Sequence, residues 1–384
     1  MFCASASATA RMIPSDGVPL HACSSARDSA TVRYPLLLAA LLSVLPACAT
    51  PPPATPRSDG NACGPVPPAK GLRVTVLGSG GPVAAGRAAT GYLIELDGAP
   101  RVLVDAGPGT FGRFGEMRLD ASRLDLVLLT HLHVDHVGEL PGLVKSRDLS
   151  GDDPVRFRVF GPAGRGVYPA TSELVKRLFG EQGAFAYLST FRNPIAFEPT
   201  DLPLDGSAPP RTLLDEGGLR VTSVVTDHGD APSIAYRIDA AGRSVVFSGD
   251  MAAKSDALVR LAAGADLLVM HAVVLDPPRS PGPLYALHAS PARIGEVAAA
   301  AHVRSVVLSH LPEAVLAASD DVLASVARGY AGEVRLAADC LRVDLPRLRR
   351  HVGTPALSPV LGMLGCPGCS PRFPVVGVKR ETTC

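Results

Sequence analysis

The sequence predicts an α/β fold, with one large folded domain over residues 71–345. Short apolar runs of strand length recur along this stretch, and Gly or Pro residues separate them. Amphipathic segments with helical spacing lie between several of these runs. The chain has 384 residues, of which 47% are hydrophobic, and this is enough to bury the core of one large domain.

Residues 1–48 have the features of an export signal with an N-terminal extension. Residues 36–45 form an apolar run that has the length of a signal-peptide core and is too short to span a bilayer. The run ends at Leu45-Pro46-Ala47-Cys48, which resembles the bacterial lipobox, in which the cysteine is lipidated. We therefore expect lipidation at Cys48 and an exported, periplasmic lipoprotein anchored to the membrane. An ordinary buried helix is the alternative for this run.

Two Pro-rich segments flank the predicted domain. Residues 49–70 are typical of an extended spacer, and residues 346–384 are predicted to be a disordered tail. A small docking or metal-binding motif is the alternative for the tail. Of the cysteines beyond Cys48, the pair Cys366–Cys369 could form a disulfide in an oxidising periplasm, while Cys63, Cys340 and Cys384 are left without an assigned partner.

The domain begins with three predicted strands, at residues 72–77, 91–96 and 101–104. The Gly-rich segment after the first strand lacks the third glycine of a dinucleotide fingerprint and is interpreted as a tight turn. Another turn, at Asp97-Gly98, joins the second and third strands. Asp105 follows the third strand and is either a turn residue or a group that orients a metal-binding histidine.

Four polar residues follow the next apolar run, 124–129, within seven positions: His131, His133, Asp135 and His136. Imidazoles at the end of a buried strand are costly to bury without a partner. Neutral imidazole and carboxylate are together the ligands that zinc and similar divalent cations accept. This cluster therefore predicts a metal site.

The middle of the domain is less regular. A helix is predicted to begin within residues 137–143, and a strand is predicted at 155–160. Residues 165–215 contain an amphipathic helix at 172–179 and several aromatic residues. One interpretation of this segment is a small helical subdomain with its own core, and the other is a lid over the metal site that selects the substrate. The aromatic residues are Phe185, Tyr187, Phe191 and Phe197.

The second half of the domain repeats one pattern, in which a His or Asp stands at the end of an apolar strand. A helix is also predicted at 291–301, with Ser290 as its N-cap and Pro291 in its first position. Loops at the ends of packed strands are where rigid scaffolds hold functional sites. The predicted strands are 219–225, 233–238, 244–247, 266–271 and 304–308, and the residues at their ends include His228, Asp250, His271 and His310.

Taken together, these motifs resemble the metallo-β-lactamase superfamily, in particular the branch that contains RNase Z and arylsulfatase-like hydrolases. The family's His-x-His-x-Asp-His motif is present in full at residues 131–136. Its later single His, its Ser-Gly-Asp turn and its last His follow in order at His228, Asp250 and His310. The resemblance covers residues 72–340 and implies a four-layer αβ/βα sandwich.

The resemblance also implies two divalent metal ions, with Zn²⁺ expected and Mn²⁺ or Fe²⁺ as alternatives. One ion would be held by His131, His133 and His228, and the other by Asp135, His136 and His310, with Asp250 bridging the two. The catalytic candidates are Asp135 and His288, and His288 resembles the residue that gives a proton to the leaving group. Position next to a helix cap is the alternative for His288, and a satisfied core histidine is the alternative for His271.

The implied reaction is hydrolysis, in which a metal-bridging hydroxide attacks a small ester, either a phosphodiester or a sulfate ester. The alternatives are a lactonase of the same superfamily, an RNase Z-like endoribonuclease and a non-catalytic metal-binding protein. The net charge is +1 and no Lys/Arg-rich run or Trp is present, so composition and the export signal weigh against nucleic acid as a partner. The expected partners are a small-molecule substrate and the membrane, and a homodimer is left open.

Overall fold

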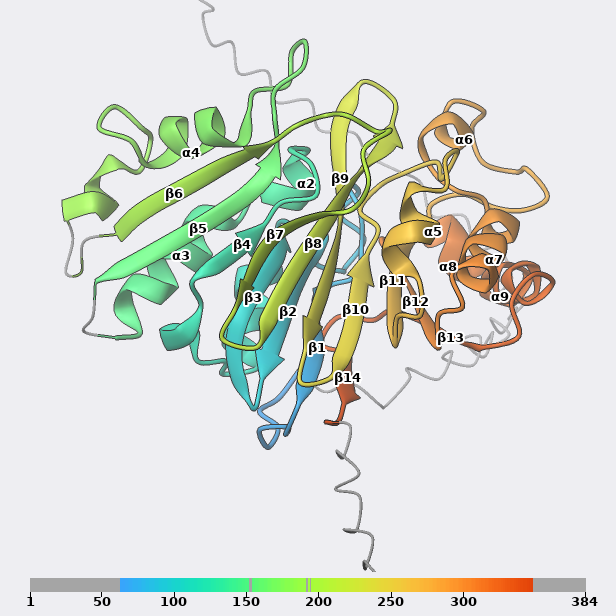
Figure 1. Ribbon diagram of the computed structural model, residues 1–384, viewed down its shortest axis with the longest axis horizontal. Coiled ribbons are helices and arrows are strands. Elements are labelled where there is room, and N and C mark those ends of the chain that lie inside the picture. The colour runs from blue at the N-terminus through green and yellow to red at the C-terminus, as the bar shows by residue number, and fades with distance from the viewer. Residues whose placement is uncertain (1–62, 152–153, 191–192, 194, 348–384) are drawn as a thin grey trace, which may run out of the picture. The chain divides into compact units, whose positions relative to one another are not determined.

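In the computed structural model, two seven-stranded mixed sheets pack face to face, and helices cover their outer faces (Figure 1). The structure describes residues 63–347, except 152–153, 191–192 and 194. The predicted export signal, Cys48, the Cys366–Cys369 pair and Phe191 therefore lie outside the described residues. Within the described ranges no helix has the length and apolar character needed to cross a bilayer.

Each sheet follows its own strand order. In the first sheet the order is β14 (Arg342–Leu345), β1 (Leu72–Gly78), β2 (Gly91–Leu96), β3 (Ala99–Ala106), β4 (Leu126–Leu128), β5 (Val155–Pro162) and β6 (Ile195–Leu202). In the second sheet it is β13 (Glu333–Leu336), β12 (Ser305–Ser309), β11 (Leu267–His271), β10 (Arg243–Phe247), β9 (Ala231–Ala240), β8 (Leu219–His228) and β7 (Arg211–Glu216).

The helices divide between the two outer faces and the loops at the ends of the strands. In the first half of the chain they are α1 (Thr110–Glu116), the short 3₁₀ helix η1 (Ala121–Arg123), α2 (Val134–Val137), α3 (Leu140–Leu149), α4 (Thr171–Phe179) and the 3₁₀ helix η2 (Ala186–Thr190). In the second half they are α5 (Ala257–Ala262), α6 (Leu284–Leu287), α7 (Pro291–Ala300), α8 (Glu313–Ala317) and α9 (Ser319–Ala327).

Three hydrophobic clusters lie between four layers in the described part of the chain. The central cluster joins the two sheets and includes Val74 from the first and Ile238 from the second. One outer cluster packs Leu143 of α3 against the first sheet, and the other packs Ile294 of α7 against the second. Burial of each such side chain contributes about 1.5–3 kcal/mol. This arrangement is the predicted four-layer αβ/βα sandwich, which is thereby confirmed.

The interpretation of residues 165–215 as a helical subdomain is wrong. The helix α4 is present, but it packs on the first sheet and shares that sheet's outer cluster instead of forming a core of its own. The rest of the segment supplies β6, which pairs in parallel with β5, and β7, which pairs with β8. Both strands lie at sheet edges and carry polar side chains, so neither has the apolar run that marked the central strands.

The strand directions explain where the polar residues gather. Strands β3, β4 and β5 are parallel to one another, and so are β10, β11 and β12. Strand β8 is antiparallel to β9, which is antiparallel to β10, so β8 runs in the same direction as β10. The carboxyl ends of these strands therefore meet at the same edge of their sheets. Every strand that the sequence places before a candidate ligand ends there.

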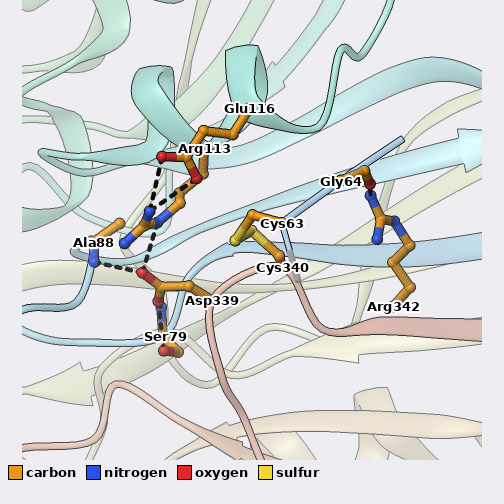
Figure 2. The surroundings of a disulfide bond; sticks show 9 residues. All are labelled: Cys63, Gly64, Ser79, Ala88, Arg113, Glu116, Asp339, Cys340 and Arg342. Carbon is orange, nitrogen blue, oxygen red and sulfur yellow. Dashed lines mark hydrogen bonds and ion pairs between the residues drawn. A yellow bond between two sulfur atoms is a disulfide. The ribbon is translucent and has the colours of Figure 1, made fainter. Parts of the chain in front are cut away.

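A disulfide between Cys63 and Cys340 ties the start of the described chain to the segment before β14 (Figure 2). The next residue back, Asp339, accepts hydrogen bonds from the backbone N–H of Ser79 (3.1 Å) and of Ala88 (2.8 Å) and from Nε of Arg113 (3.0 Å). It therefore fixes both ends of the loop at 79–88. The two cysteines are 277 positions apart, and sequence spacing gave no reason to pair them.

Candidate metal centre

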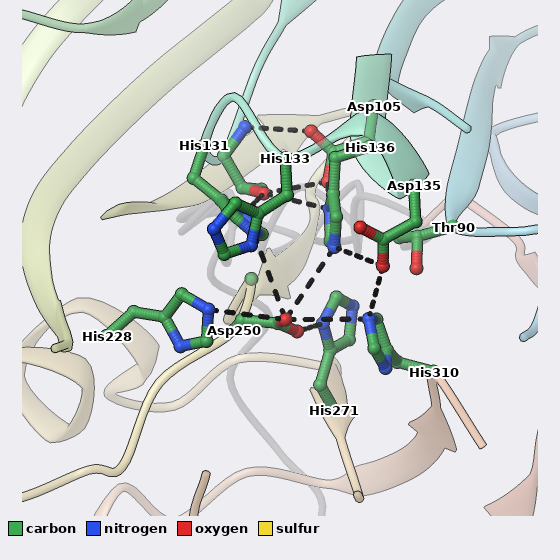
Figure 3. A network of polar contacts seen from close by, with 12 residues as sticks. Thr90, Asp105, His131, His133, Asp135, His136, His228, Asp250, His271 and His310 are labelled. Carbon is green, nitrogen blue, oxygen red and sulfur yellow. Dashed lines mark hydrogen bonds and ion pairs between the residues drawn. The ribbon is translucent and has the colours of Figure 1, made fainter. Parts of the chain in front are cut away.

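The residues predicted to bind metal converge from four strand ends (Figure 3). The segment after β4 supplies four of them, because the backbone turns into the short helix α2 at His133 and places Asp135 and His136 on its single turn. His228 is the last residue of β8, Asp250 follows β10, and His310 follows β12. The structure thus brings together all seven residues named as ligands from the sequence, and it places His271, the last residue of β11 and also a candidate from the sequence, beside them.

Oδ2 of Asp250 lies at the centre of this cluster. Four imidazole nitrogens of the described residues surround it at similar distances: Nε2 of His310 at 3.4 Å, of His228 at 3.6 Å, of His136 at 3.7 Å and of His131 at 3.8 Å. These separations are longer than good hydrogen bonds. Two ligand atoms on one tetrahedral zinc, each about 2.0–2.2 Å from the ion, lie about 3.3–3.6 Å apart. The spacing is therefore that of groups that share cations.

Two main sets of possible ligand atoms form this cluster, each with members within 4.8 Å of one another, and a smaller set of His228, Asp250 and His288 overlaps both. One set is His131, His133 and His228, which is the first site expected from the sequence. The other is His136, Asp250, His271 and His310. Asp135 stands beside this second set, with Oδ2 at 3.1 Å from Nε2 of His310 and 3.6 Å from Nε2 of His136.

Asp105 orients one member of the second set, His136, through a hydrogen bond to its ring. Its Oδ2 accepts a hydrogen bond from Nδ1 of His136 at 2.8 Å, and its two oxygens also accept from the backbone N–H and the hydroxyl of Thr130, each at 2.8 Å. Asp105 is fully buried and has φ 57°, a left-handed conformation that costs a non-glycine residue energy and recurs at functional sites. Nε2 of His136 is left buried and without a hydrogen-bond partner among the described residues.

His271 orients the central carboxylate instead. Its Nδ1 donates to Oδ1 of Asp250 at 2.6 Å, and its Nε2 accepts from the hydroxyl of Tyr92 at 2.9 Å. Both ring nitrogens are therefore satisfied, as expected for a buried histidine, but the partner is the carboxylate at the centre of the site. Tyr92 was not identified from the sequence, because nothing distinguishes it from any other aromatic residue on a buried strand.

The protonation states of most of these groups favour the binding of a cation. Burial lowers the pKa of His131 well below its ordinary value, and it lowers the pKa of His133 and that of His271, the latter to about 4. Burial alone would raise the pKa of Asp250, but the charges of His310 and His136 outweigh it and hold that pKa well below its ordinary value. Metal ligation needs these forms, neutral imidazole and ionised carboxylate.

The protonation of His136 also indicates a site that suits a cation. Burial alone would lower its pKa, but the charges of Asp105 and Asp250 and the hydrogen bond to Asp105 raise it to about 10. The two buried carboxylates thus hold a proton on this ring because they need positive charge nearby. A divalent cation at Nε2 would replace that proton and supply the charge. The donor types, their spacing and this unpartnered nitrogen all fit two divalent cations.

A cavity of about 720 Å³ opens over the centre. It is lined by His133, Asp135, His228, Asp250 and His310, and by three further stretches within residues 80–87, 273–288 and 311–314. His288 lies in this lining, buried, with its ring 5.1 Å from that of His228. Its Nδ1 has no hydrogen-bond partner in the described ranges.

The lid interpretation of residues 165–215 is also wrong for the aromatic residues described. None of Phe185, Tyr187 and Phe197 lines the cavity, and Phe185 and Phe197 pack on the outer cluster of the first sheet. One residue of the segment does reach the centre, since the hydroxyl of Tyr168 lies 3.4 Å from Nε2 of His133. The sequence offered no signal for that contact.

Comparison with known proteins agrees with this geometry. The family described as "Beta-lactamase superfamily domain" matches residues 100–311. The chain belongs to the metallo-β-lactamase superfamily. Ribonuclease Z of Mycobacterium avium (strain 104) is 32% identical over 292 residues, which cover 71% of this chain and 98% of that protein. The predicted family and branch are therefore confirmed, and so is the assignment as a metal-dependent hydrolase.

Solved structures show the same metallo-β-lactamase fold. The short form of human tRNase Z aligns with a TM-score of 0.55 at 22% identity, and the alignment covers 71% of this chain and 99% of that one. The metallo-β-lactamase fold protein YhfI of Bacillus subtilis aligns with a TM-score of 0.53 at 22% identity, with 71% and 98% covered. The superfamily implies divalent metal ions, typically zinc.

Asp105→Asn tests whether the outer carboxylate prepares His136 for a cation. We expect the variant to fold and to bind Zn²⁺ about 10- to 100-fold more weakly, because the loss of an outer carboxylate partner costs this much affinity. Affinity is measured by competition with a coloured chelator. Asp215→Asn, which removes an exposed carboxylate paired with Arg220, serves as the matched control. Equal affinities in the two variants would contradict the role of Asp105.

Proposed function

We propose that this chain is a two-metal phosphodiester hydrolase. The observation that carries the proposal is the position of Asp250 Oδ2, 3.4–3.8 Å from four imidazole nitrogens drawn from both ligand sets. Asp250 would bridge the cations, with His131, His133 and His228 on one side and Asp135, His136 and His310 on the other. When bound, two such cations polarise a phosphoryl oxygen and bring the pKa of a shared water to near neutral.

Asp135 is proposed to receive a proton from the attacking water. Its side chain lines the cavity and is largely buried. Burial alone would raise the pKa of its carboxyl group, but the hydrogen bond from His310 and the charge of His136 outweigh this and lower it. The group is therefore a carboxylate at neutral pH and able to accept a hydrogen bond from the nucleophile.

His288 is proposed to give a proton to the leaving group. Its ring lies in the lining of the cavity beside His228, and its Nδ1 makes no hydrogen bond to the described residues. A buried nitrogen without a partner is costly unless a ligand supplies one. An anionic ester in the cavity would both occupy this position and favour the protonated ring.

RNA is the second candidate substrate, and the curated relatives favour it. The relatives named Ribonuclease Z match over nearly their whole length, and this weighs against the expectation that nucleic acid is not a partner. The sequence itself offers a net charge of +1 and no basic run. We keep phosphodiester hydrolysis as the shared chemistry of both candidates.

We further propose that the protein is exported and held at a membrane by a lipid on Cys48. The lipobox-like sequence supports this, and so does the disulfide between Cys63 and Cys340. Structural disulfides form and persist in oxidising compartments such as the periplasm.

Hydrolysis of bis(p-nitrophenyl) phosphate tests the proposal. We expect activity that a chelator removes and that Zn²⁺ or Mn²⁺ restores. Asp250→Asn should lower kcat/KM by more than about 100-fold, because losing a bridging ligand costs more than losing an outer partner. Asp215→Asn is the control and should keep full activity. Unchanged activity after complete removal of metal would rule the proposal out.

His288→Asn tests the proton donor through the leaving group. For esters that release an aliphatic alcohol, we expect kcat to fall by about 10²- to 10⁴-fold, the usual share of a general acid. For esters that release p-nitrophenolate the fall should be small, because this anion leaves without a proton. Metal content is measured in the same samples and should not change. An equal loss for both kinds of ester would show that His288 has another role.

A further inference from the structure

The cavity over the metal centre has an apolar wall, and we infer from it that the preferred substrate is an ester with an alkyl or aryl substituent. The inference rests on the proposed hydrolytic function of the same site and concerns its specificity. The wall is defined by Val83, Leu275, Pro281, Leu284, Leu287 and Pro312, all of which line the cavity.

Several of these side chains are apolar groups left open to the cavity. Val83 is 73% exposed, and Val134, at the same cavity, is 69% exposed. Leu284 and Leu287, one turn apart on α6, are only half-buried. Apolar side chains that gather in a concave site mark a place where an apolar ligand group is removed from water.

The part of the wall from Leu275 to α6 is held in place by its own hydrogen bonds. The hydroxyl of Tyr285 donates to the carbonyl of Leu275 (2.6 Å) and accepts from the backbone N–H groups of Arg279 (3.0 Å) and Ser280 (3.2 Å). These contacts close the segment from Leu275 to α6 on itself. A preformed wall loses little conformational entropy when a ligand binds.

The wall is also joined to the reacting centre. Nδ1 of His228 donates to the carbonyl oxygen of Leu287 at 3.1 Å, so a member of the wall positions a candidate metal ligand directly. The next residue is His288, the proposed proton donor. A substituent on the phosphorus held at the metal centre would therefore lie against Leu287 and Leu284.

The charges in the lining do not suit a polyanion. Among the described residues that line the cavity, the cationic side chains are Arg87 and Arg279, and both have partners. Nη1 of Arg87 donates to Oγ of Ser79 (2.7 Å) and to the carbonyl of Ala337 (3.0 Å), and Nη2 of Arg279 pairs with Asp321 (2.7 Å). Glu313 adds a negative charge. Binding a polynucleotide needs several cations for the phosphates on either side of the scissile one.

The experiment compares p-nitrophenyl alkyl phosphates that carry methyl, butyl or hexyl groups, with the full metal-loaded chain. We expect kcat/KM to rise about 2- to 4-fold for each added methylene group until the wall is covered. Leu284→Ser and Val83→Ser should flatten this rise, so that kcat/KM falls most for the hexyl ester and least for the methyl ester. Val167→Ser is the matched control, since Val167 is 91% exposed and lies outside the lining.

Binding of methylphosphonate and hexylphosphonate, measured by calorimetry, separates this inference from the proposed function. Tighter binding of the hexyl compound, lost in Leu284→Ser, supports the wall even if no ester is hydrolysed. Hydrolysis with equal kcat/KM for all three alkyl groups would overturn the inference and leave the proposed function standing. A short RNA cleaved faster than the hexyl ester would also overturn it.

Discussion

The buried carboxylate of Asp250 is the group on which the rest of the site depends. It is 3% exposed, and an anion in such a position is stable only with positive charge or hydrogen bonds around it. His271 satisfies one oxygen, and Tyr92 holds His271 in turn. The other oxygen faces imidazoles from three strand ends at distances suited to shared cations. The sandwich delivers these groups because the strands that carry them run in the same direction within each sheet and end at one edge.

Two further features of the backbone allow the ligand residues to converge. Asp105 and His310 both have left-handed backbone conformations, with φ of 57° and 60°, which turn the chain sharply at the end of a strand. Gly81 passes so close to His310 that a Cβ there would lie 2.5 Å from the imidazole Cε1. The loop that contains Gly81 is in turn held by Asp339, next to the disulfide at Cys340. The strand ends thus supply the metal ligands, and loops held by residues outside the site determine the shape of the cavity above them. This division lets one fold serve different substrates.

Sequence patterns predicted what depends on local signals. The central strands carry long apolar runs, and the helix at 291–300 has the cap and proline that mark a helix start, so both were predictable. Each metal-site candidate stands next to such a strand, and this made the cluster recognisable from the sequence alone. Strands β6, β7, β13 and β14 were not predicted. All four lie at sheet edges, and they are short or polar, so they lack the apolar run that marks a central strand. The Cys63–Cys340 pair and the contact of Tyr168 with His133 join distant segments, and no local pattern encodes them. The interpretations of residues 165–215 were wrong for the same reason, because this segment packs on and pairs with sheets that distant parts of the chain complete.

The proposed chemistry requires two cations bridged by the carboxylate of Asp250. Anomalous diffraction from crystals grown with Zn²⁺, collected on both sides of the zinc absorption edge, measures this directly. The expected result is two peaks about 3.5–4 Å apart, the spacing of two-metal hydrolytic sites, with Asp250 between them. A single ion, or two ions that do not share Asp250, would contradict the account.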